Sequence, residues 1–169
     1  MEEKRPRLLK AEEIEVKIKK LYPKGAVALL YKTARVDMDI LDETFGPAGW
    51  SNDYKEIKGN LYCGIRVGDV WKWDCGIESR EDDEGNQKKG EASDAFKRAG
   101  FRWGIGRELY TAPPIWIPRE KLTVQDNKVK DTLWVQQILY DDSRRISALA
   151  IKSDKSKKGE WAFLWQAQS

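Results

Sequence analysis

Three short strand-forming runs joined by two tight-turn signals restrict the fold more than any other feature of the sequence. The runs cover residues 50–57, 61–67 and 70–77, and they are joined by Lys58-Gly59-Asn60 and by Gly68-Asp69. Glycine next to Asn or Asp is typical of tight hairpin turns, because these turns need positive backbone φ angles. The sequence therefore predicts an antiparallel meander of three strands.

A short amphipathic helix is predicted before the meander. Thr33 is a candidate N-cap, and Gly46-Pro47 is a stop signal. Between these two signals, apolar residues recur at helical spacing, namely Val36, Ile40, Leu41 and Phe45.

A longer helix is predicted after the meander, over residues 89–103. On a helical wheel its apolar residues form one stripe that is expected to cover the meander, namely Ala92, Phe96, Ala99 and Trp103. The charged segment 78–88 has no periodicity and is expected to be an exposed loop.

Further strands are predicted towards both ends of the chain. Residues 14–18 alternate between apolar and polar, and a turn-forming Tyr22-Pro23-Lys24-Gly25 joins them to the apolar run 26–31, which indicates a hairpin. Residues 113–118 form a proline-rich extended connector. The remaining strands are expected at residues 133–140, 146–151 and 161–165, with linkers at 141–143 and 152–159.

These elements predict an α+β fold with the order β-β-α-β-β-β-α, in which a long helix packs on an antiparallel meander, followed by extra C-terminal strands. We expect a flexible N-terminus over residues 1–11, a core over 12–118, and a β-rich extension of the same domain over 119–169. A chain of 169 residues with 40% apolar and 11% aromatic content is about the size of one domain with one core.

Composition also indicates where the protein resides. With a mean hydropathy of -0.71 and 35% charged residues, no apolar run approaches the ~18 residues of a membrane span. The start, MEEKRPRLLK, is too polar for a signal peptide. We therefore expect a soluble cytoplasmic protein with no membrane partner.

The absence of histidine excludes several kinds of chemistry. An imidazole base, a Cys/His zinc site and the Ser-His-Asp and Cys-His nucleophiles all need this residue. Cys63 and Cys75 stand twelve residues apart without a CxxC motif, which favours buried strand residues in a reducing compartment. Gly104-Ile105-Gly106 lacks the third glycine of a phosphate-binding loop, and no GxxxxGK[ST] motif occurs, so ATP hydrolysis is not expected.

One enzymatic alternative stays open. Glu56-Ile57-Lys58 places a carboxylate two residues from a lysine in a predicted strand, and Asp39 or Asp42 would supply a second metal ligand. This combination suits a metal-dependent nuclease. It is also common by chance in a sequence with 35% charged residues.

Positive charge is concentrated in residues 88–107. Six basic residues stand there against Glu91 and Asp94, a surplus of four that exceeds the net charge of +3 of the whole chain. On the wheel, Lys97 and Arg98 lie on the side away from the apolar stripe, with Arg102 one turn from Arg98. This face suits a phosphate backbone. A solvated helix face, with Asp94 and Arg98 as an i,i+4 pair, is the structural alternative.

Aromatic and basic residues also alternate at four places, namely Tyr31-Lys32, Tyr54-Lys55, Trp71-Lys72-Trp73 and Phe101-Arg102-Trp103. Proteins that bind single strands combine cations with rings that stack on bases. Rings at strand spacing also pack in cores, and Trp71 and Trp73 share one face of a strand by parity. Exposure of these rings would favour the binding role.

Two segments around residue 100 resemble a known family. Residues 90–99 (GEASDAFKRA) and 103–110 (WGIGRELY) are similar to the signature helix of the Rad-fifty-two superfamily of single-strand annealing proteins, in its short phage form, the Sak type. Residues 35–50, ending in LDETFGPAGW, resemble the helix of that family that enters its sheet, as does Tyr62-Cys63-Gly64-Ile65. The resemblance covers about residues 12–112 in the same order.

The resemblance implies a phage-encoded protein of the bacterial host cytoplasm that anneals complementary DNA strands in recombination and repair without ATP. It implies a homo-oligomer, a ring or a helical filament, with single-stranded DNA in a basic groove. Lys97 and Arg98 match the Lys-Arg pair of this groove, and Lys17 matches the basic residue that ends the first strand. We add Lys32, Arg35 and Arg102 as candidate contacts. No catalytic residue, cofactor or metal ion is expected.

Residues 120–169 lie outside the resemblance, and three roles are open to them: extending the sheet, contacting a neighbouring subunit, or contacting a host single-stranded DNA-binding protein. The extended C-terminal region with which the longer eukaryotic members contact a recombinase has no counterpart here, so the resemblance leaves recombinase loading open. The rival functions are a metal-dependent nuclease and a passive single-stranded DNA-binding protein.

Overall fold

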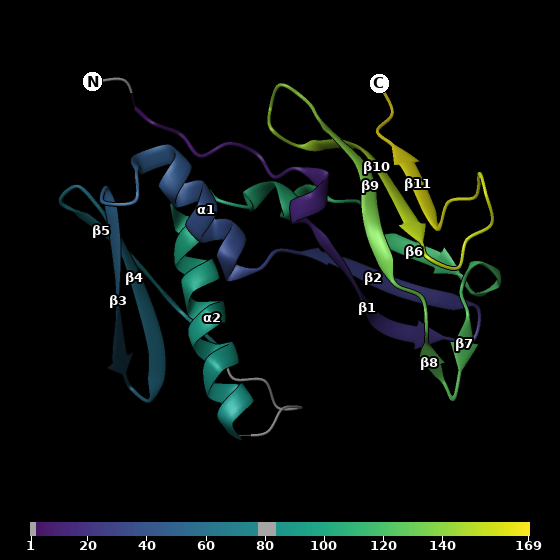
Figure 1. Cartoon of the computed structure of the whole chain (residues 1–169), viewed down its shortest axis with the longest axis horizontal. Coiled ribbons are helices and arrows are strands. Elements are labelled where there is room, and N and C mark those ends of the chain that lie inside the picture. Colours follow the sequence, from purple (N-terminus) through teal and green to yellow (C-terminus); the bar gives the residue numbers. More distant parts are fainter. Residues whose placement is uncertain (1–2, 78–83) are drawn as a thin grey trace. The chain divides into compact units, whose positions relative to one another are not determined.

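Residues 3–77 and 84–169 are described in the structure, a computed structural model, and they fall into two units (Figure 1). Unit 1 comprises the described parts of Met1–Leu8 and Thr33–Arg107, and unit 2 comprises Leu9–Lys32 and Glu108–Ser169. The first hairpin therefore belongs to the same unit as the C-terminal strands. This division crosses the expected core of residues 12–118 instead of following its boundary.

Unit 1 contains the predicted meander and both predicted helices. Its antiparallel sheet has the order β3-β4-β5. The strands are β3 (Trp50–Ile57), β4 (Asn60–Val67) and β5 (Val70–Cys75), and the helices are α1 (Ala34–Phe45) and α2 (Glu84–Arg102). The hairpin turns form where glycine allows them, with Gly59 at a φ of 76° and Gly68 at 58°.

The core of unit 1 lies between α2 and one face of the meander. Cys63 and Ile65 of β4 are fully buried, as are Phe96 and Ala99 of α2. Trp103 donates a hydrogen bond from Nε1 to the carbonyl of Ile65 at 3.0 Å, which fixes the end of the helix on the sheet. The predicted role of the apolar stripe is therefore confirmed.

The second helix begins earlier than expected. It starts at Glu84, so residues 84–88 are helical and not part of a loop, while residues 78–83 lie outside the described part of the chain. Gln87, Lys88 and Lys89 have good helix propensity, which explains why the helix extends into a charged segment that has no apolar stripe. At α1 the predicted start is confirmed, although the Thr33 side chain makes no capping hydrogen bond.

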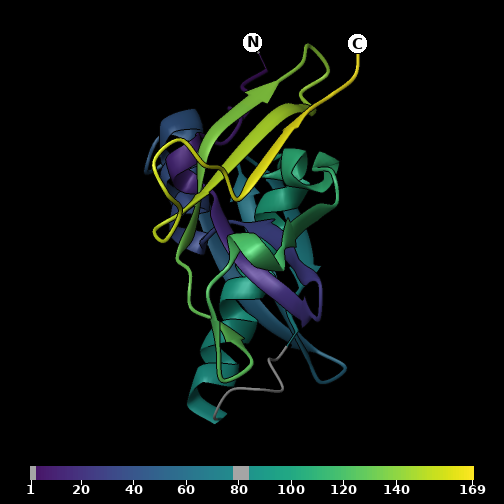
Figure 2. The same cartoon turned by 90° about the vertical axis from the view of Figure 1, so that its right-hand side faces the viewer.

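Unit 2 is built around a six-stranded antiparallel sheet in the order β11-β10-β9-β1-β2-β6. Its edge strands β6 and β11 are in contact, so the sheet comes close to closing as a barrel; Figure 2 views it with its yellow-green strands towards the reader. The six strands are β1 (Glu15–Tyr22), β2 (Gly25–Tyr31), β6 (Ile115–Pro118), β9 (Leu133–Tyr140), β10 (Ile146–Ser153) and β11 (Phe163–Gln166).

Smaller elements complete unit 2. A short hairpin is formed by β7 (Val124–Gln125) and β8 (Lys128–Val129). Three 3-10 turns are η1 (Ala11–Glu13), η2 (Arg107–Thr111), whose first residue belongs to unit 1, and η3 (Arg119–Lys121). The predicted extended connector contains β6, and β10 continues to Ser153, so the linker expected at residues 152–159 begins two residues later.

The N-terminal segment is attached to both units where the structure describes it. In unit 1, Arg7 donates from Nε to Glu43 at 2.7 Å. In unit 2, Leu9 is buried, its N–H donates to Glu108 at 2.8 Å, and its carbonyl accepts a hydrogen bond from the Tyr140 hydroxyl at 2.8 Å. These contacts fix residues that the charged sequence led us to expect as flexible.

The α+β fold class and the order β-β-α-β-β-β-α with additional C-terminal strands are confirmed. Both cysteines are free thiols on strands, Cys63 buried and Cys75 half-buried. Burial raises the pKa of Cys63 to about 11, so this thiol stays protonated at neutral pH. Among the described residues, none of the helices has the length and apolar character that a membrane span requires.

Candidate nucleic-acid interface

Arg98 and Arg102 lie one turn apart on α2, and both contact one carboxylate on β5. The Nε of Arg98 is 3.3 Å from Oδ1 of Asp74, and the Nε of Arg102 is 2.9 Å from Oδ2. The arginine side chains are 47% and 54% exposed, whereas that of Asp74 is 14% exposed. A phosphate in solution can therefore reach both guanidinium groups while the carboxylate holds them side by side.

Asp74 keeps its charge in this position. Burial alone would raise its pKa, but a hydrogen bond from the N–H of Cys75, at 2.7 Å, and the two arginines together hold the pKa below its ordinary value. The carboxylate is thus ionised at neutral pH and balances part of the arginine charge.

Two more cations lie at the C-terminal end of α2. Lys72 of β5 donates from Nζ to the carbonyl of Arg102 at 3.3 Å and lies 4.3 Å from the centre of the Trp103 ring. Arg107 donates to the carbonyls of Phe101 and Arg102 at 2.7 and 2.9 Å. Cations are stabilised here because the carbonyls at the end of a helix carry partial negative charge.

We call Lys72, Arg98, Arg102 and Arg107 the α2 cation cluster. Together with Asp74 it has a formal surplus of three positive charges, since its four basic residues surround one acid. Two of its arginines are well placed for bidentate contacts with phosphate oxygens, which the planar guanidinium favours. Such a cluster can hold a nucleic-acid backbone without reading its bases.

The other candidate contacts are distributed over both units. Lys97 is half-buried beside Arg98 on α2, and Arg35 is exposed at the start of α1, both in unit 1. Lys17 is exposed on β1 of unit 2. Lys32 follows β2 and is only 7% exposed, so a bound strand would have little access to it. Lys97, Arg98 and Arg102 are thus the predicted residues that one helix brings together.

Sequence reasoning missed Asp74, and it singled out Lys72 only within the run Trp71-Lys72-Trp73 and not as a neighbour of α2. It considered Asp94 as the partner of Arg98, but the Asp94 carboxylate accepts a hydrogen bond from the N–H of Ile77 at 3.0 Å, and Arg98 bonds to Asp74 instead. A signal was present: Lys72 and Asp74 are two apart on a predicted strand, so they share the face that the helix covers. Their partners on α2 do not follow from the sequence, because the sequence does not show how the helix packs on β5.

The face of the meander away from α2 carries an aromatic pair. Trp71 and Trp73 stack with ring centres 5.3 Å apart, and Lys55 lies 4.6 Å above the Trp73 ring. The predicted sharing of one face is confirmed, and Trp71 is 39% exposed. Trp73 lies across Gly64, where an added Cβ would come within 2.5 Å of the ring. By contrast, Tyr54 faces α2 and donates to the Ala92 carbonyl at 3.4 Å.

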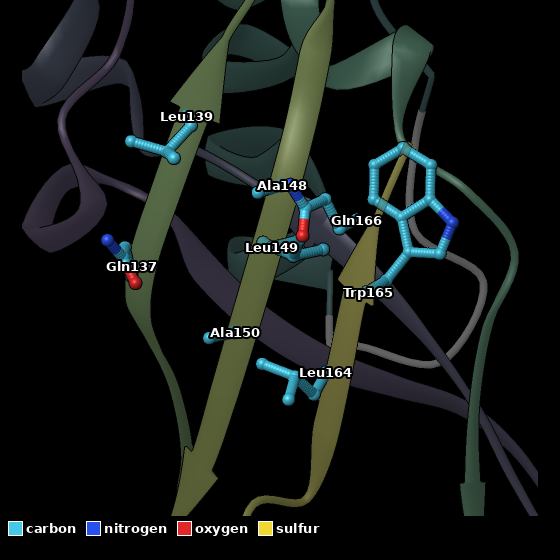
Figure 3. A pocket seen from close by; sticks show the side chains of 8 residues that line it. All are labelled: Gln137, Leu139, Ala148, Leu149, Ala150, Leu164, Trp165 and Gln166. Atoms are coloured by element: carbon cyan, nitrogen blue, oxygen red, sulfur yellow. The ribbon is translucent and has the colours of Figure 1, made fainter. Parts of the chain in front are cut away.

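An open hollow of about 390 Å³ lies over strands β9, β10 and β11 of unit 2 (Figure 3). Its lining contains no ionisable side chain and consists of Gln137, Leu139, Ala148, Leu149, Ala150, Leu164, Trp165 and Gln166. Leu139 lies on β9 and Leu164 on β11, with β10 between the two strands, and both side chains are strongly exposed. A lining of this kind offers contact to apolar groups but no acid, base or metal ligand.

The residues of the nuclease alternative do not converge. Glu56 is exposed on β3, and Asp42 of α1 accepts a hydrogen bond from Trp50 Nε1 at 2.7 Å. In residues 3–77 and 84–169 there is no group of three or more acidic, histidine or cysteine side chains that could hold a metal ion.

Comparison with known proteins adds no assignment. No protein-family model matches the chain, and a search of curated proteins found no match.

Proposed function

We propose that this protein binds single-stranded DNA and anneals complementary strands without ATP, in recombination and DNA repair. The observation that carries the proposal is the α2 cation cluster, in which Arg98 and Arg102 are half exposed and aligned on Asp74. Exposed arginines one turn apart fit the phosphates of a flexible strand. The sequence resemblance to phage annealing proteins supports the same function.

The mechanism requires charge neutralisation and not covalent chemistry. Two complementary strands repel each other through their phosphates, and cations that replace the counterions lower this repulsion. Contacts to phosphates leave the base edges free, so a held strand can test its register against a second strand. The protein then acts by holding the strand, which needs neither a nucleotide cofactor nor a metal ion.

Annealing also requires several protomers. The α2 cation cluster has four cations, enough for only a few phosphates, whereas a stable duplex needs many nucleotides held in one path. We therefore propose that copies assemble side by side into a ring or a filament, which is what head-to-tail contacts produce. Residues 119–169 are candidates for further contacts, either with a neighbouring subunit or with a host single-stranded DNA-binding protein. The two free cysteines fit a reducing cytoplasm.

A strand-annealing assay in EDTA and without ATP separates this proposal from its rivals. Two complementary labelled oligonucleotides are mixed with the protein, and both pairing and strand length are followed. An annealing protein accelerates pairing and leaves the strands intact. Slower pairing than without protein indicates a passive binder, and shortening of the strands after magnesium is added indicates a nuclease; either result would overturn the proposal.

A further inference from the structure

Strands β1, β2 and β6 of unit 2 present a second surface with aromatic and basic side chains. Their inward residues, such as Ala26, Ala28 and Ile117, are almost completely buried. Their outward residues are exposed or partly exposed, and we call the following set the β1–β2–β6 face: Lys17, Lys20, Tyr22, Leu29 and Trp116. All of these residues belong to one unit, so the face exists without any contribution from unit 1.

A bulge in β1 creates this grouping. The pairing between β1 and β2 shifts between Ile18 and Lys20, which adds one residue to β1. In a regular strand Lys17 and Lys20 would point to opposite faces, but the extra residue brings Lys20 and Tyr22 onto the side of Lys17. Lys20 then lies in one cross-strand row with Val27 of β2 and Trp116 of β6.

Trp116 is held as a rigid platform on this face. Its indole lies against Gly25, where an added Cβ would come within 2.6 Å of the ring. Tyr22 contacts it from the side, with ring centres 5.9 Å apart and planes at 45°. The residue nevertheless remains 41% exposed. A ring fixed in this way loses little conformational entropy when a ligand stacks on it.

Cations surround the two rings. The Nζ of Lys20 is 5.1 Å from the centre of the Tyr22 ring, and Arg119 donates from Nη1 to the Tyr22 carbonyl at 3.2 Å. The nearest acid on these strands, Glu15, is engaged with the Tyr31 hydroxyl; this hydrogen bond, followed by burial, raises the pKa of Tyr31 to about 12. With Lys17 and Lys20 on the face and Arg119 directly after β6, three cations lie here, and they favour a polyanion over a neutral or basic partner.

We propose that the β1–β2–β6 face binds single-stranded nucleic acid by stacking unpaired bases on Trp116 and Tyr22, with Lys17, Lys20 and Arg119 near the phosphates. The inference rests on the proposed function only for the choice of single-stranded DNA as ligand. The β1–β2–β6 face lies in unit 2, whereas the α2 cation cluster lies in unit 1. Stacking on an aromatic ring depends on the flat face of a base and leaves the pairing edge free. A strand held here is therefore still able to pair.

The test compares a strand of thymidines with an abasic strand of the same length, which has the same phosphates and no bases. Wild-type protein is expected to prefer the thymidine strand. Trp116→Leu is expected to lower this preference at least about fivefold, the lower end of what one stacked base contributes. Trp116→Phe keeps a ring and is expected to retain part of the preference. Tyr110→Leu is the control: it removes an exposed ring of unit 2 outside this face and is expected to retain the full preference.

The double variant Arg98→Ala/Arg102→Ala separates this inference from the proposed function. It is expected to weaken binding of both strands equally and to keep the preference. If this double variant binds normally while Trp116→Leu loses the preference, the α2 cation cluster fails as a site and this inference stands. If wild-type protein binds neither strand, both fail.

Three results would overturn the inference alone: an unchanged preference in Trp116→Leu, an equal loss in Tyr110→Leu, or a Trp116→Leu variant that changes only the oligomeric mass. The last result would make the face an interface between copies. Thermal unfolding checks that each variant is folded. Should Trp116→Leu not fold, Lys17→Gln with Lys20→Gln decides the question, since it is expected to weaken binding of both strands at least about threefold, and unchanged binding would overturn the inference.

Discussion

Arg102 donates a hydrogen bond from Nε to Oδ2 of Asp74 at 2.9 Å, which joins the last turn of α2 to strand β5. The bond links two residues that are 28 positions apart in the sequence. It aligns an exposed guanidinium group, and it also places a carboxylate where a phosphate would compete for the same N–H donors. Asp74 is thus both a positioning residue and a limit on the positive charge of the α2 cation cluster.

Replacing Asp74 with asparagine is expected to tighten binding of single-stranded DNA about twofold to fivefold at low salt. The substitution removes one negative charge beside two arginines, and the amide oxygen can still accept the hydrogen bond from Cys75. An exposed ion pair contributes ~0.2–1 kcal/mol, and the upper part of this interval, ~0.4–1 kcal/mol, corresponds to a twofold to fivefold change in affinity. Fluorescence anisotropy with a labelled oligonucleotide measures the effect. Weaker binding would mean that aligning the arginines matters more than the charge that Asp74 adds.

The Asp74 carboxylate also predicts that the stability of the folded protein depends on pH in the acidic range. Because the pKa of Asp74 is below its ordinary value of 3.8 in the folded protein, its stabilising contribution is complete above that value and is lost as the pH falls through the lower, folded-state pKa. Asp74→Asn has no such contribution to lose. The difference in Tm between wild type and Asp74→Asn is therefore expected to shrink as the pH is lowered from about 5 to about 2. A constant difference would show that the ion pairs add nothing.

Arg98→Ala and Arg102→Ala are each expected to weaken binding of single-stranded DNA about threefold or more and to lower the salt dependence. Each lost phosphate contact reduces the slope of log affinity against log salt by roughly 0.7 for single strands. Arg66→Ala is the matched control, because this arginine of the same unit is similarly exposed and pairs with Asp69 at 3.3 Å. Equal losses in all three variants would indicate a general charge effect and not a site.

Two glycine substitutions are expected to change stability in opposite directions. At Gly76 an added Cβ would lie 2.2 Å from the carbonyl of Glu91 in α2, so Gly76→Ala forces the helix away from the sheet and costs ~1–3 kcal/mol. At Gly90, inside α2, no atom other than those of the adjoining residues and of the helix's own backbone lies within 4 Å of the added Cβ, and alanine is the better helix former by ~1 kcal/mol. Urea unfolding of the two variants checks both signs. A stable Gly76→Ala would contradict the close contact between α2 and the meander.

The sequence predicts local elements of this fold well, and its failures have a physical cause. The meander is readable because Gly59 and Gly68 specify turns between adjacent strands. The six-stranded sheet cannot be predicted from the sequence in this way, because its strand pairs join residues that are far apart in the chain. Glu15 pairs with Trp134, and Gly25 pairs with Pro118. The site shows the same contrast: the position of Arg98 on its helix follows from periodicity, whereas its bond to Asp74 depends on how α2 packs on β5.

The bulge in β1 shows a second limit. Strict alternation would group Lys17 with Lys19 and Leu21, and it would leave Lys20 and Tyr22 on the other face. The extra residue after Ile18 reverses this assignment. A single inserted residue changes which side chains share a surface, and no turn signal in the sequence marks it.

The annealing rate of the double variant Arg98→Ala/Arg102→Ala tests the central claim most directly. It is measured with two complementary fluorescent oligonucleotides in EDTA and without ATP, alongside wild type and Arg66→Ala. The wild type and Arg66→Ala are expected to accelerate pairing to the same degree. The double variant is expected to be at least about tenfold slower, because it has lost two of the cations that hold the strand. A folded double variant that anneals as fast as the wild type would contradict the account.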